Sequence, residues 1–463
     1  MVNSFPHGND IASIIGSRID KLGRIPVKRS IVIAISLAGF FALYDVSNFQ
    51  YISPVLKSDW HLTDAQIAYA ISTRILGQVI GAFCMAIYAD WKGRKPALII
   101  TLITLAIGSI LVAISTNIFQ VSMFRLLTGI GIGAEVVIAA AYIGEMSPRS
   151  MRGRYTSVIF LIGAIGFASS GPVSFMLLQQ GNIMGIDSWR IVMAIPTVVA
   201  LLLLRLRYSM IESPRWLLSK GRIKETNMVL VKLGLAPIHQ NQEIIDDSTT
   251  IAPKKTNILL HSFNNRRVLS RASLFVSLWF LILVSGGAAN LLVVEYVNQG
   301  YTTTQSVAIT TIGGVGYVIG ACLSIMIADK FERKHQFVLA SLIMGIAFIL
   351  RGLLIHDYVG LAAASFIGFA ANSWVIACLF TYTAENFPTR IRSIASGAVE
   401  GIGSGLSTVG PIIFVLLNPF GFLNMMIGLA SFLFAAAAAV ILLGNRSVGI
   451  SLEELNRYDV DKK

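Results

Sequence analysis

The chain has 463 residues, of which 55% are hydrophobic and only 13% are charged. This composition excludes an ordinary soluble protein, and many apolar runs approach the ~20 residues that span a bilayer, so we predict an integral membrane protein. The net charge of +13 requires no nucleic-acid partner, because cationic loops facing an anionic membrane leaflet account for it.

Residues 1–30 precede the first long apolar run and are expected to form a cytoplasmic N-terminal segment. They are not a cleaved signal, because that run is too long, carries Asp45 and is followed by no small-residue cleavage pattern. Helical spacing of isoleucines beside basic residues predicts an interfacial helix, and the alternative is a disordered leader that only supplies charge. The apolar positions are Ile11, Ile14, Ile15, Ile19 and Leu22.

Hydropathy predicts an all-α membrane protein of twelve transmembrane helices. Residues 31–211 are expected to form an N-terminal six-helix bundle, and residues 271–444 a C-terminal one. A cytoplasmic linker at 212–270 joins the two bundles, and a cytoplasmic tail follows at 445–463. The predicted spans are 31–54, 65–89, 97–115, 118–144, 155–178, 190–206, 272–297, 305–327, 336–354, 359–384, 393–417 and 421–444.

The positive charges predict the orientation of these spans. If both termini face the cytoplasm, all but five of the 37 Lys and Arg residues lie on cytoplasmic segments. The positive-inside rule therefore favours this topology in the cell membrane. The five exceptions are Lys57, Arg190 and Arg351 near the outer face, and Arg74 and Arg125 within spans.

A charged loop signature occurs twice. The segment from Asp90 through Gly93 and Arg94 returns 239 residues later as the segment from Asp329 to Arg333. The glycine allows a tight turn, and the Asp can form a charge pair in one conformation only. We therefore expect the loops to act as a latch between conformations, and the alternative is that their positive charge only enforces topology.

A second signature is duplicated at nearly the same offset. Glu145 with Arg152 returns 240 residues later as Glu385 with Arg392. Two repeats at matching offsets indicate a duplicated unit, so the two bundles should be pseudo-symmetric and the four residues should belong to the same latch. Two repeated membrane bundles are typical of a transporter, whose solute site lies between the halves.

Three charged side chains are predicted at similar depths inside the membrane. At about 1.5 Å per residue, Asp45 and Arg125 lie about 20 Å above the inner face, and Arg74 about 16 Å above it. Desolvation favours the protonated form of a buried carboxyl, whereas a nearby guanidinium favours the carboxylate. We interpret Asp45 with Arg125 as a proton-coupling pair and both arginines as anion-binding residues; the alternative is a static structural ion pair.

Other polar positions in the spans are candidates of lower rank. Glu135 is expected to bind the proton or the latch loop, or alternatively to pair with cytoplasmic cations such as Lys92. Asn290 and Tyr44 are candidate substrate-binding residues, and Trp374 is expected either to stack on a planar ligand or to pack in the core. The three cysteines show no metal-ligand spacing, so neither a metal nor a cofactor is expected.

Four segments together resemble the major facilitator superfamily. They match its D-x-x-G-R-K loop, its span-four R-x-x-x-G-x-G-x-G run, the P-E-S-P-R-W-L segment of the sugar-porter-like branch and that branch's tail. The segments are Asp90–Lys95, Arg125–Glu135, Ile211–Leu218 and Leu452–Leu455.

The resemblance covers about residues 30–455 and implies the twelve-helix fold. It also implies that Tyr44-Asp45 and Arg125 stand where proton-coupled sugar porters place their coupling pair. Sugar porters carry paired glutamines in span seven, where this chain keeps only Asn290. Together with the segment Tyr382–Arg392, this resembles relatives that carry organic acids and nicotinate-type compounds.

We therefore predict a secondary active transporter, not an enzyme, that moves a small polar or anionic metabolite together with a proton. Our first expectation is a transporter of an organic acid. The second is a proton-coupled sugar importer, and the third is a receptor that binds substrate without transporting it. The chain has no GxxxxGK[ST] motif for an ATP-driven motor. Its expected partners are the substrate, protons and the lipid bilayer, and the protein is expected to be a monomer.

Overall fold

The computed structural model describes residues 15, 18–20, 22, 25–27, 29–148, 152–238, 266–327, 330–387 and 392–445. The tail expected at 445–463 lies outside this set apart from its first residue, and so do residues 239–265 of the expected linker between the bundles. Within the described residues, twelve helical spans are long and apolar enough to cross a membrane, which confirms the predicted fold class.

The first half contains six long helices and a small hairpin. A β-hairpin of β1 (Asn182–Ile183) and β2 (Ile186–Asp187) precedes the last of the six helices. The helices are α2 (Arg29–Asp59), α3 (Asp64–Lys92), α4 (Arg94–Ala113), α5 (Ile118–Met146), α6 (Arg152–Leu178) and α7 (Ser188–Tyr208).

Two short linker helices, α8 (Pro214–Ser219) and α9 (Ile223–Lys232), follow the first half. The second half repeats the six spans, but two of them are broken by 3-10 turns. The six spans of the second half are, in chain order, α12 (Arg266–Ala288) with η2 (Ala289–Leu291) and α13 (Leu292–Asn298); α14 (Thr303–Ile327); α15 (Arg333–Leu353); α16 (Tyr358–Glu385); α17 (Arg392–Leu406) with η3 (Ser407–Val409), α18 (Gly410–Leu417) and η4 (Asn418–Phe420); and α19 (Phe422–Leu443).

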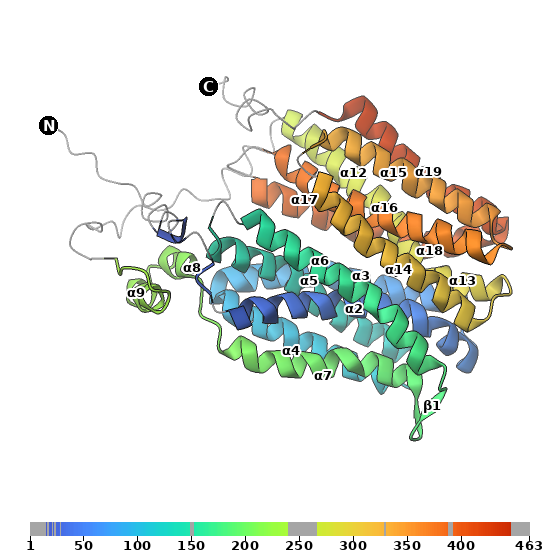
Figure 1. Cartoon of the computed structure of the whole chain (residues 1–463), viewed down its shortest axis with the longest axis horizontal. Coiled ribbons are helices and arrows are strands. Elements are labelled where there is room, and N and C mark those ends of the chain that lie inside the picture. Colours follow the sequence, from blue (N-terminus) through green and yellow to red (C-terminus); the bar gives the residue numbers. More distant parts are fainter. Residues whose placement is uncertain are drawn as a thin grey trace.

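The packing of the helices reproduces the duplication seen in the sequence. α3 packs against α5, and its counterpart α14 packs against α16. In the same way α4 packs on α7 as α15 does on α19, and α2 packs on α6 as α12 does on α17. The halves meet where α6 contacts α14 and where α3 contacts α17 and α18 (Figure 1). Because α13 also contacts α2, the interface between the halves contains both the broken seventh and the broken eleventh span.

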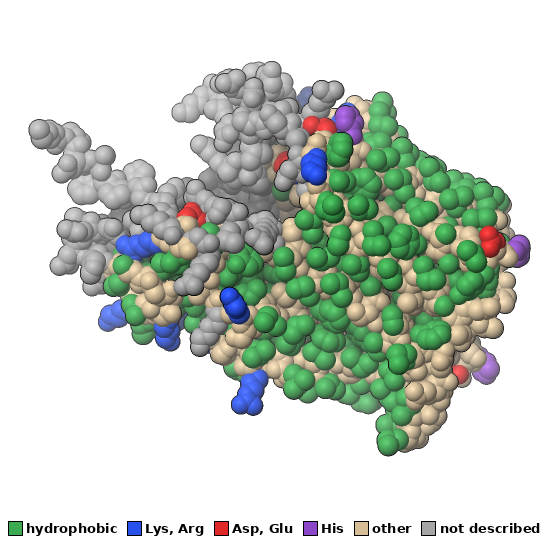
Figure 2. All heavy atoms as spheres, viewed as in Figure 1, with side chains coloured by type: hydrophobic (Ala, Val, Ile, Leu, Met, Phe, Trp, Pro, Cys, Tyr) green, Lys and Arg blue, Asp and Glu red, His purple; other side chains and the backbone are tan. Residues whose placement is uncertain are grey.

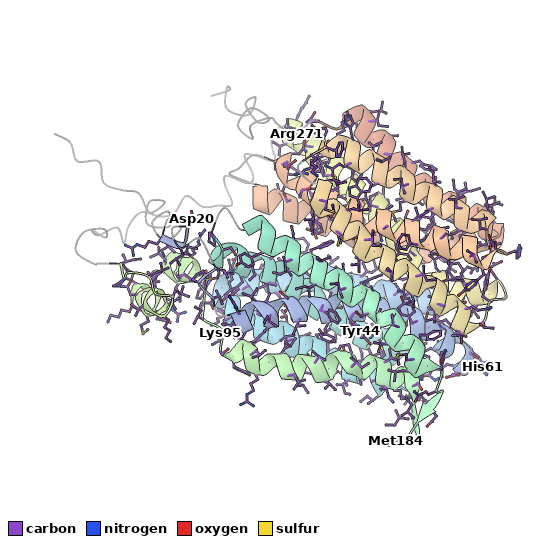
Figure 3. All side chains as sticks on the ribbon, in the orientation of Figure 1. Asp20, Tyr44, His61, Lys95, Met184 and Arg271 are labelled. Carbon is purple, nitrogen blue, oxygen red and sulfur yellow. The ribbon has the colours of Figure 1, made fainter. Side chains whose placement is uncertain are left out.

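The bundle has two chemically distinct ends. One end carries the charged loop at Lys95 and the linker helices, and we call it the motif end (Figures 1 and 3). The opposite end, which carries His61 and the β-hairpin, is called the far end (Figure 3). Hydrophobic side chains cover the visible face between the two ends (Figure 2), as expected of a surface in contact with lipid.

Part of the N-terminal segment packs on the linker helices. Ile15 and Ile19 are fully buried in a cluster with Leu230 and Ile238, and the Arg18 guanidinium donates to the Ala236 carbonyl at 2.7 Å. The apolar face expected to lie in the membrane interface is therefore covered by protein at the two isoleucines that the structure describes.

Glycines allow the closest helix crossings in each half. A Cβ at Gly77 or Gly81 of α3 would collide with backbone carbonyls of α5, and a Cβ at Gly316 or Gly320 of α14 would collide with those of α16. The two pairs stand 239 residues apart, like the charged loops. Small residues permit such backbone contact in lipid, where no hydrophobic effect drives helix association.

We predict that Gly77→Ala destabilises the protein although alanine favours helices. Overpacking of a close contact costs about 1–3 kcal/mol, so the thermal unfolding midpoint of the detergent-purified protein should fall by several degrees. Gly397→Ala is the matched control, because nothing lies near a Cβ at that position. A fall of equal size in both variants would contradict the role assigned to the crossing.

Candidate functional site

Asp45 lies in the middle of α2 with 1% of its surface exposed. One carboxylate oxygen accepts a hydrogen bond of 3.4 Å from the Ser109 hydroxyl of α4, and the other has no hydrogen-bond partner. Arg125 and Arg74 both act on this carboxylate through their charges. Among the described residues, however, neither arginine comes within the 4.0 Å of a direct ion pair with it.

The two arginines are held by other groups. The Arg125 Nε of α5 donates to the Ala70 carbonyl at 3.3 Å, and its guanidinium lies 4.0 Å from the centre of the Phe49 ring. The Arg74 Nη1 of α3 donates to the Gln78 side chain at 3.0 Å, while its Nε has no partner. The cation–π contact and the single hydrogen bonds hold the guanidiniums in place and leave part of their hydrogen-bonding capacity free.

A narrow gap with no room for even a water molecule lies beside the two guanidiniums. Ligand sites usually measure about 300–1,000 Å³, so this gap must widen before it can hold a metabolite. Both halves line it, because Asn290 of η2 faces the residues of the first half. The lining residues are Val46, Phe49, Gln50, Ile71, Arg74, Arg125 and Asn290.

Gln50 is a lining residue that the sequence analysis missed. It is 2% exposed, and neither its amide oxygen nor its amide nitrogen has a hydrogen-bond partner. A buried amide without partners is costly unless something else satisfies it. Its signal in the sequence is an amide within an apolar span, five residues after Asp45.

Two expected substrate-binding residues do not line the gap. Tyr44 is buried on α2 (Figure 3), with its ring 6.4 Å from that of Phe40 and 5.7 Å from that of Phe41. Trp374 packs, partly buried, against the apolar core that includes the second half. The Tyr44 hydroxyl and the Trp374 indole nitrogen are buried without a partner, so their expected roles in binding stay predictions.

Glu135 lies in a different cluster from Asp45. It forms a buried ion pair with Arg207 of α7, and it accepts a further hydrogen bond of 2.7 Å from the Thr101 hydroxyl of α4. The same Arg207 donates to the Leu98 carbonyl at 2.5 Å. Glu135 therefore pairs with a cation expected on the cytoplasmic side, as the alternative held, although this cation is Arg207 and not Lys92. These contacts join three helices. The proton-coupling role expected for Glu135 stays a prediction.

The duplicated motifs form two equivalent charge clusters at the motif end. Arg94 pairs with Asp90 at 2.6 Å and with Glu145 at 3.0 Å. In the second half Arg333 pairs with Glu385 at 3.3 Å, at the equivalent positions. Each of these pairs lies within one half. Asp329 and the side chains of Arg152 and Arg392 lie outside the described residues.

The linker segment is fastened to the first of these clusters. Gly93 adopts φ +117° at the turn before α4, a conformation that favours glycine. The Glu212 carboxylate accepts hydrogen bonds from the backbone N–H groups of Arg94 and Lys95 at 3.0 and 3.1 Å. The Trp216 indole donates to the Asp90 carbonyl at 3.0 Å. Burial raises the pKa of Glu212, while these backbone donors oppose that effect.

Three hydrogen bonds among the described residues join the halves away from the motif end. At the far end, Lys57 of α2 donates to the Asn298 side chain of α13 at 2.8 Å, and Asn298 donates to Asp64 of α3 at 3.4 Å. Closer to the centre, the Ser72 hydroxyl donates to the Thr408 carbonyl of η3 at 2.8 Å. In this conformation the described hydrogen bonds thus close the far side of the interface.

We predict that the buried pair of Glu135 and Arg207 stabilises the fold of the first half. Arg207→Leu leaves a buried carboxylate without its cation and should cost about 3–5 kcal/mol. The double variant Glu135→Leu with Arg207→Leu should recover most of this loss, because it removes both buried charges. Thermal unfolding in detergent of the wild type, Arg207→Leu, Glu135→Leu and the double variant measures the coupling, and additive effects would contradict the assignment.

Comparisons with known proteins identify the family of this chain. Residues 33–457 match the family described as "Sugar (and other) transporter". The chain is 24% identical to the niacin transporter NiaP of Acinetobacter baylyi, covering 95% of this chain and 99% of that protein. It is 23% identical to the arabinose-proton symporter of Bacillus subtilis, covering 94% and 97%.

A solved structure shares the fold. The inward open conformation of the xylose transporter XylE from E. coli superposes with a TM-score of 0.73 at 21% identity, covering 93% of this chain and 99% of that one. The chain therefore belongs to the sugar (and other) transporter family of the major facilitator superfamily, whose members are multi-pass membrane transporters and not enzymes.

Proposed function

We propose that this protein is a secondary active transporter that carries a small polar or anionic metabolite, in first place an organic acid, together with a proton. The observation that supports it best is a gap that both halves and two buried guanidiniums line, next to a buried carboxylate, Asp45, on which both guanidiniums act through their charges. An ionisable group at this depth in a membrane protein is expensive and is rarely retained without a function.

Asp45 is the proton-carrying group in this mechanism. Arginine has no accessible neutral form, so a carboxyl must take the proton. When the guanidiniums act on Asp45, its ionised form is favoured; when an anionic substrate draws their charge, the protonated form is favoured. Binding of substrate and of proton then support each other, because coupling between two sites is reciprocal.

The two ends of the bundle supply the alternating access. The bonds among Lys57, Asp64 and Asn298 close the far side in this conformation. The charge clusters of the motif end are the latch. Their charged groups exchange their partners within each half for partners in the other half when that side closes. The positive charges of the sequence favour an orientation in which the motif end and both termini face the cytoplasm of the cell. Since each half lines the gap, a monomer suffices for transport.

A proton-coupled sugar importer is the second candidate. The family match and the arabinose-proton symporter among the relatives favour it. The gap, however, offers only the amides of Gln50 and Asn290 beside two cations. A sugar needs hydrogen-bonding groups matched around its hydroxyls, whereas two guanidiniums suit a carboxylate. The third candidate is a receptor that binds its substrate without transporting it. Any measured accumulation of substrate would exclude this candidate.

We predict that Asp45→Asn abolishes proton-driven accumulation and retains substrate exchange. Proteoliposomes containing the wild type or the variant are given an acidic exterior, and uptake is measured for nicotinate, benzoate, arabinose and xylose. The amide cannot carry a proton, so accumulation should vanish while counterflow of the accepted substrate continues. Asp59→Asn, at an exposed position, is the control and should behave as wild type. Equal accumulation by Asp45→Asn and wild type would remove Asp45 from the mechanism.

We also predict that Arg94→Gln slows transport more than it weakens binding. Loss of both ion pairs should lower kcat by about tenfold, equivalent to 1.4 kcal/mol, and change KM by less than about twofold. Arg222→Gln is the matched control, because Arg222 forms an exposed pair with Glu225, a type of pair that contributes little. A large rise in KM with unchanged kcat in Arg94→Gln would argue against a latch.

A further inference from the structure

The charges buried at the centre of the protein do not cancel. Asp45 faces Arg74 and Arg125, and all three are at least nine-tenths buried. Two guanidiniums against one carboxylate leave one net positive charge when Asp45 is ionised. Among the described residues, the charged groups that act on Asp45 are these two arginines. The central site thus has a fixed excess of positive charge in a low-dielectric setting.

Other buried charges are compensated or held elsewhere. Glu135 pairs with Arg207, and Arg333 pairs with Glu385. Toward the far end, Glu295 accepts from Asn298 and Gln299. None of these groups contributes to the charge interactions of the central arginines.

Two further ionisable groups lie in spans of the second half. Arg351 donates to the Ser365 carbonyl and lies against the rings of Phe348 and Phe369. Glu400 lies on α17, next to Gly401, which approaches Phe83 of α3. Neither takes part in the charge interactions of Asp45, Arg74 or Arg125. The central excess charge therefore belongs to these three residues.

The site also has unsatisfied hydrogen-bonding groups directed at the gap. The Arg74 Nε and both polar atoms of the Gln50 side chain have no partner, and both residues line the gap. Unmade hydrogen bonds of buried groups are costly, and a charged donor is the most costly to leave unmade. A ligand with acceptor oxygens and one negative charge would satisfy the guanidinium and the excess charge together.

On the basis of the proposed function, we propose that the transporter is selective for monovalent anions and carries one proton with each, so that the cycle is electroneutral. Protonation of Asp45 raises the net charge of the site by one, and a bound monoanion lowers it by one. The empty, deprotonated site and the loaded, protonated site then carry the same charge. A neutral substrate would leave the protonated site with two uncompensated positive charges.

Paired ligands of nearly equal shape test the selectivity. Binding to the full-length protein in detergent is measured by thermal shift with nicotinate and nicotinamide, benzoate and benzamide, lactate and lactamide, and gluconate and glucose. The monoanion of at least one pair should stabilise the wild type more than its neutral counterpart. Equal binding of anions and neutral compounds, or binding of no monoanion in the panel, overturns the proposal.

Variants at the gap separate charge from shape. Arg74→Gln should weaken anion binding about 10- to 100-fold, as expected for loss of a charge-assisted hydrogen bond, and leave the neutral compound nearly unchanged. Arg74→Lys keeps the charge and should keep the preference. Gln50→Leu is the matched control, because it alters the same gap without changing its charge, and it should affect both members of a pair alike. An anion preference that survives in Arg74→Gln overturns the proposal.

Proteoliposomes test the stoichiometry with the preferred monoanion. For one proton per monoanion, each pH unit of gradient supports about tenfold accumulation, since the two represent the same free energy. A potassium diffusion potential of either sign, set with valinomycin, should change steady-state accumulation less than twofold. Accumulation driven by potential alone overturns electroneutrality. Anion preference without any proton-driven accumulation would instead overturn the proposed symport and leave the anion assignment standing.

Discussion

Three charged side chains buried in the low-dielectric interior constrain how the helices at the centre of this protein are arranged. Asp45, Arg74 and Arg125 come from α2, α3 and α5, so three helices of the first half must keep their relative positions for these charges to act on one another. Their free energy depends on what else enters the gap and on whether Asp45 holds a proton. That dependence is what makes a buried charged cluster useful to a transporter, where occupancy must change the preferred conformation.

The second half contributes little charge to the centre and supplies a broken helix instead. Span seven is interrupted by the 3-10 turn that carries Asn290, and span eleven by the turn that carries Thr408. Thr408 accepts a hydrogen bond from the first half, and Asn290 lines the gap. Irregular backbone within a membrane is tolerated where protein covers it or where it lines a cavity. The two halves are thus alike in packing and different in chemistry.

Rigid connections surround this centre. The Glu135–Arg207 pair joins helices toward the motif end, and the glycines of α3 bring its backbone against α5, the helix that carries Arg125. These contacts favour movement of each half as a unit. Among the described residues, three hydrogen bonds join the halves. The two at the far end involve partly exposed side chains, which can exchange partners at low cost.

The sequence alone determined the membrane class, the twelve spans and the twofold repeat, because hydrophobic length and duplicated motifs are local or periodic properties of a chain. It also predicted similar depths for Asp45, Arg74 and Arg125, since depth follows from position along a helix. The tertiary structure decided which faces those helices present to one another. In the structure Glu135 pairs with Arg207, and Asp45 forms no direct ion pair with any described residue. Gln50 lines the gap, whereas Tyr44 and Trp374 do not. These outcomes depend on helix rotation and on contacts between residues far apart in the chain, which no local pattern specifies.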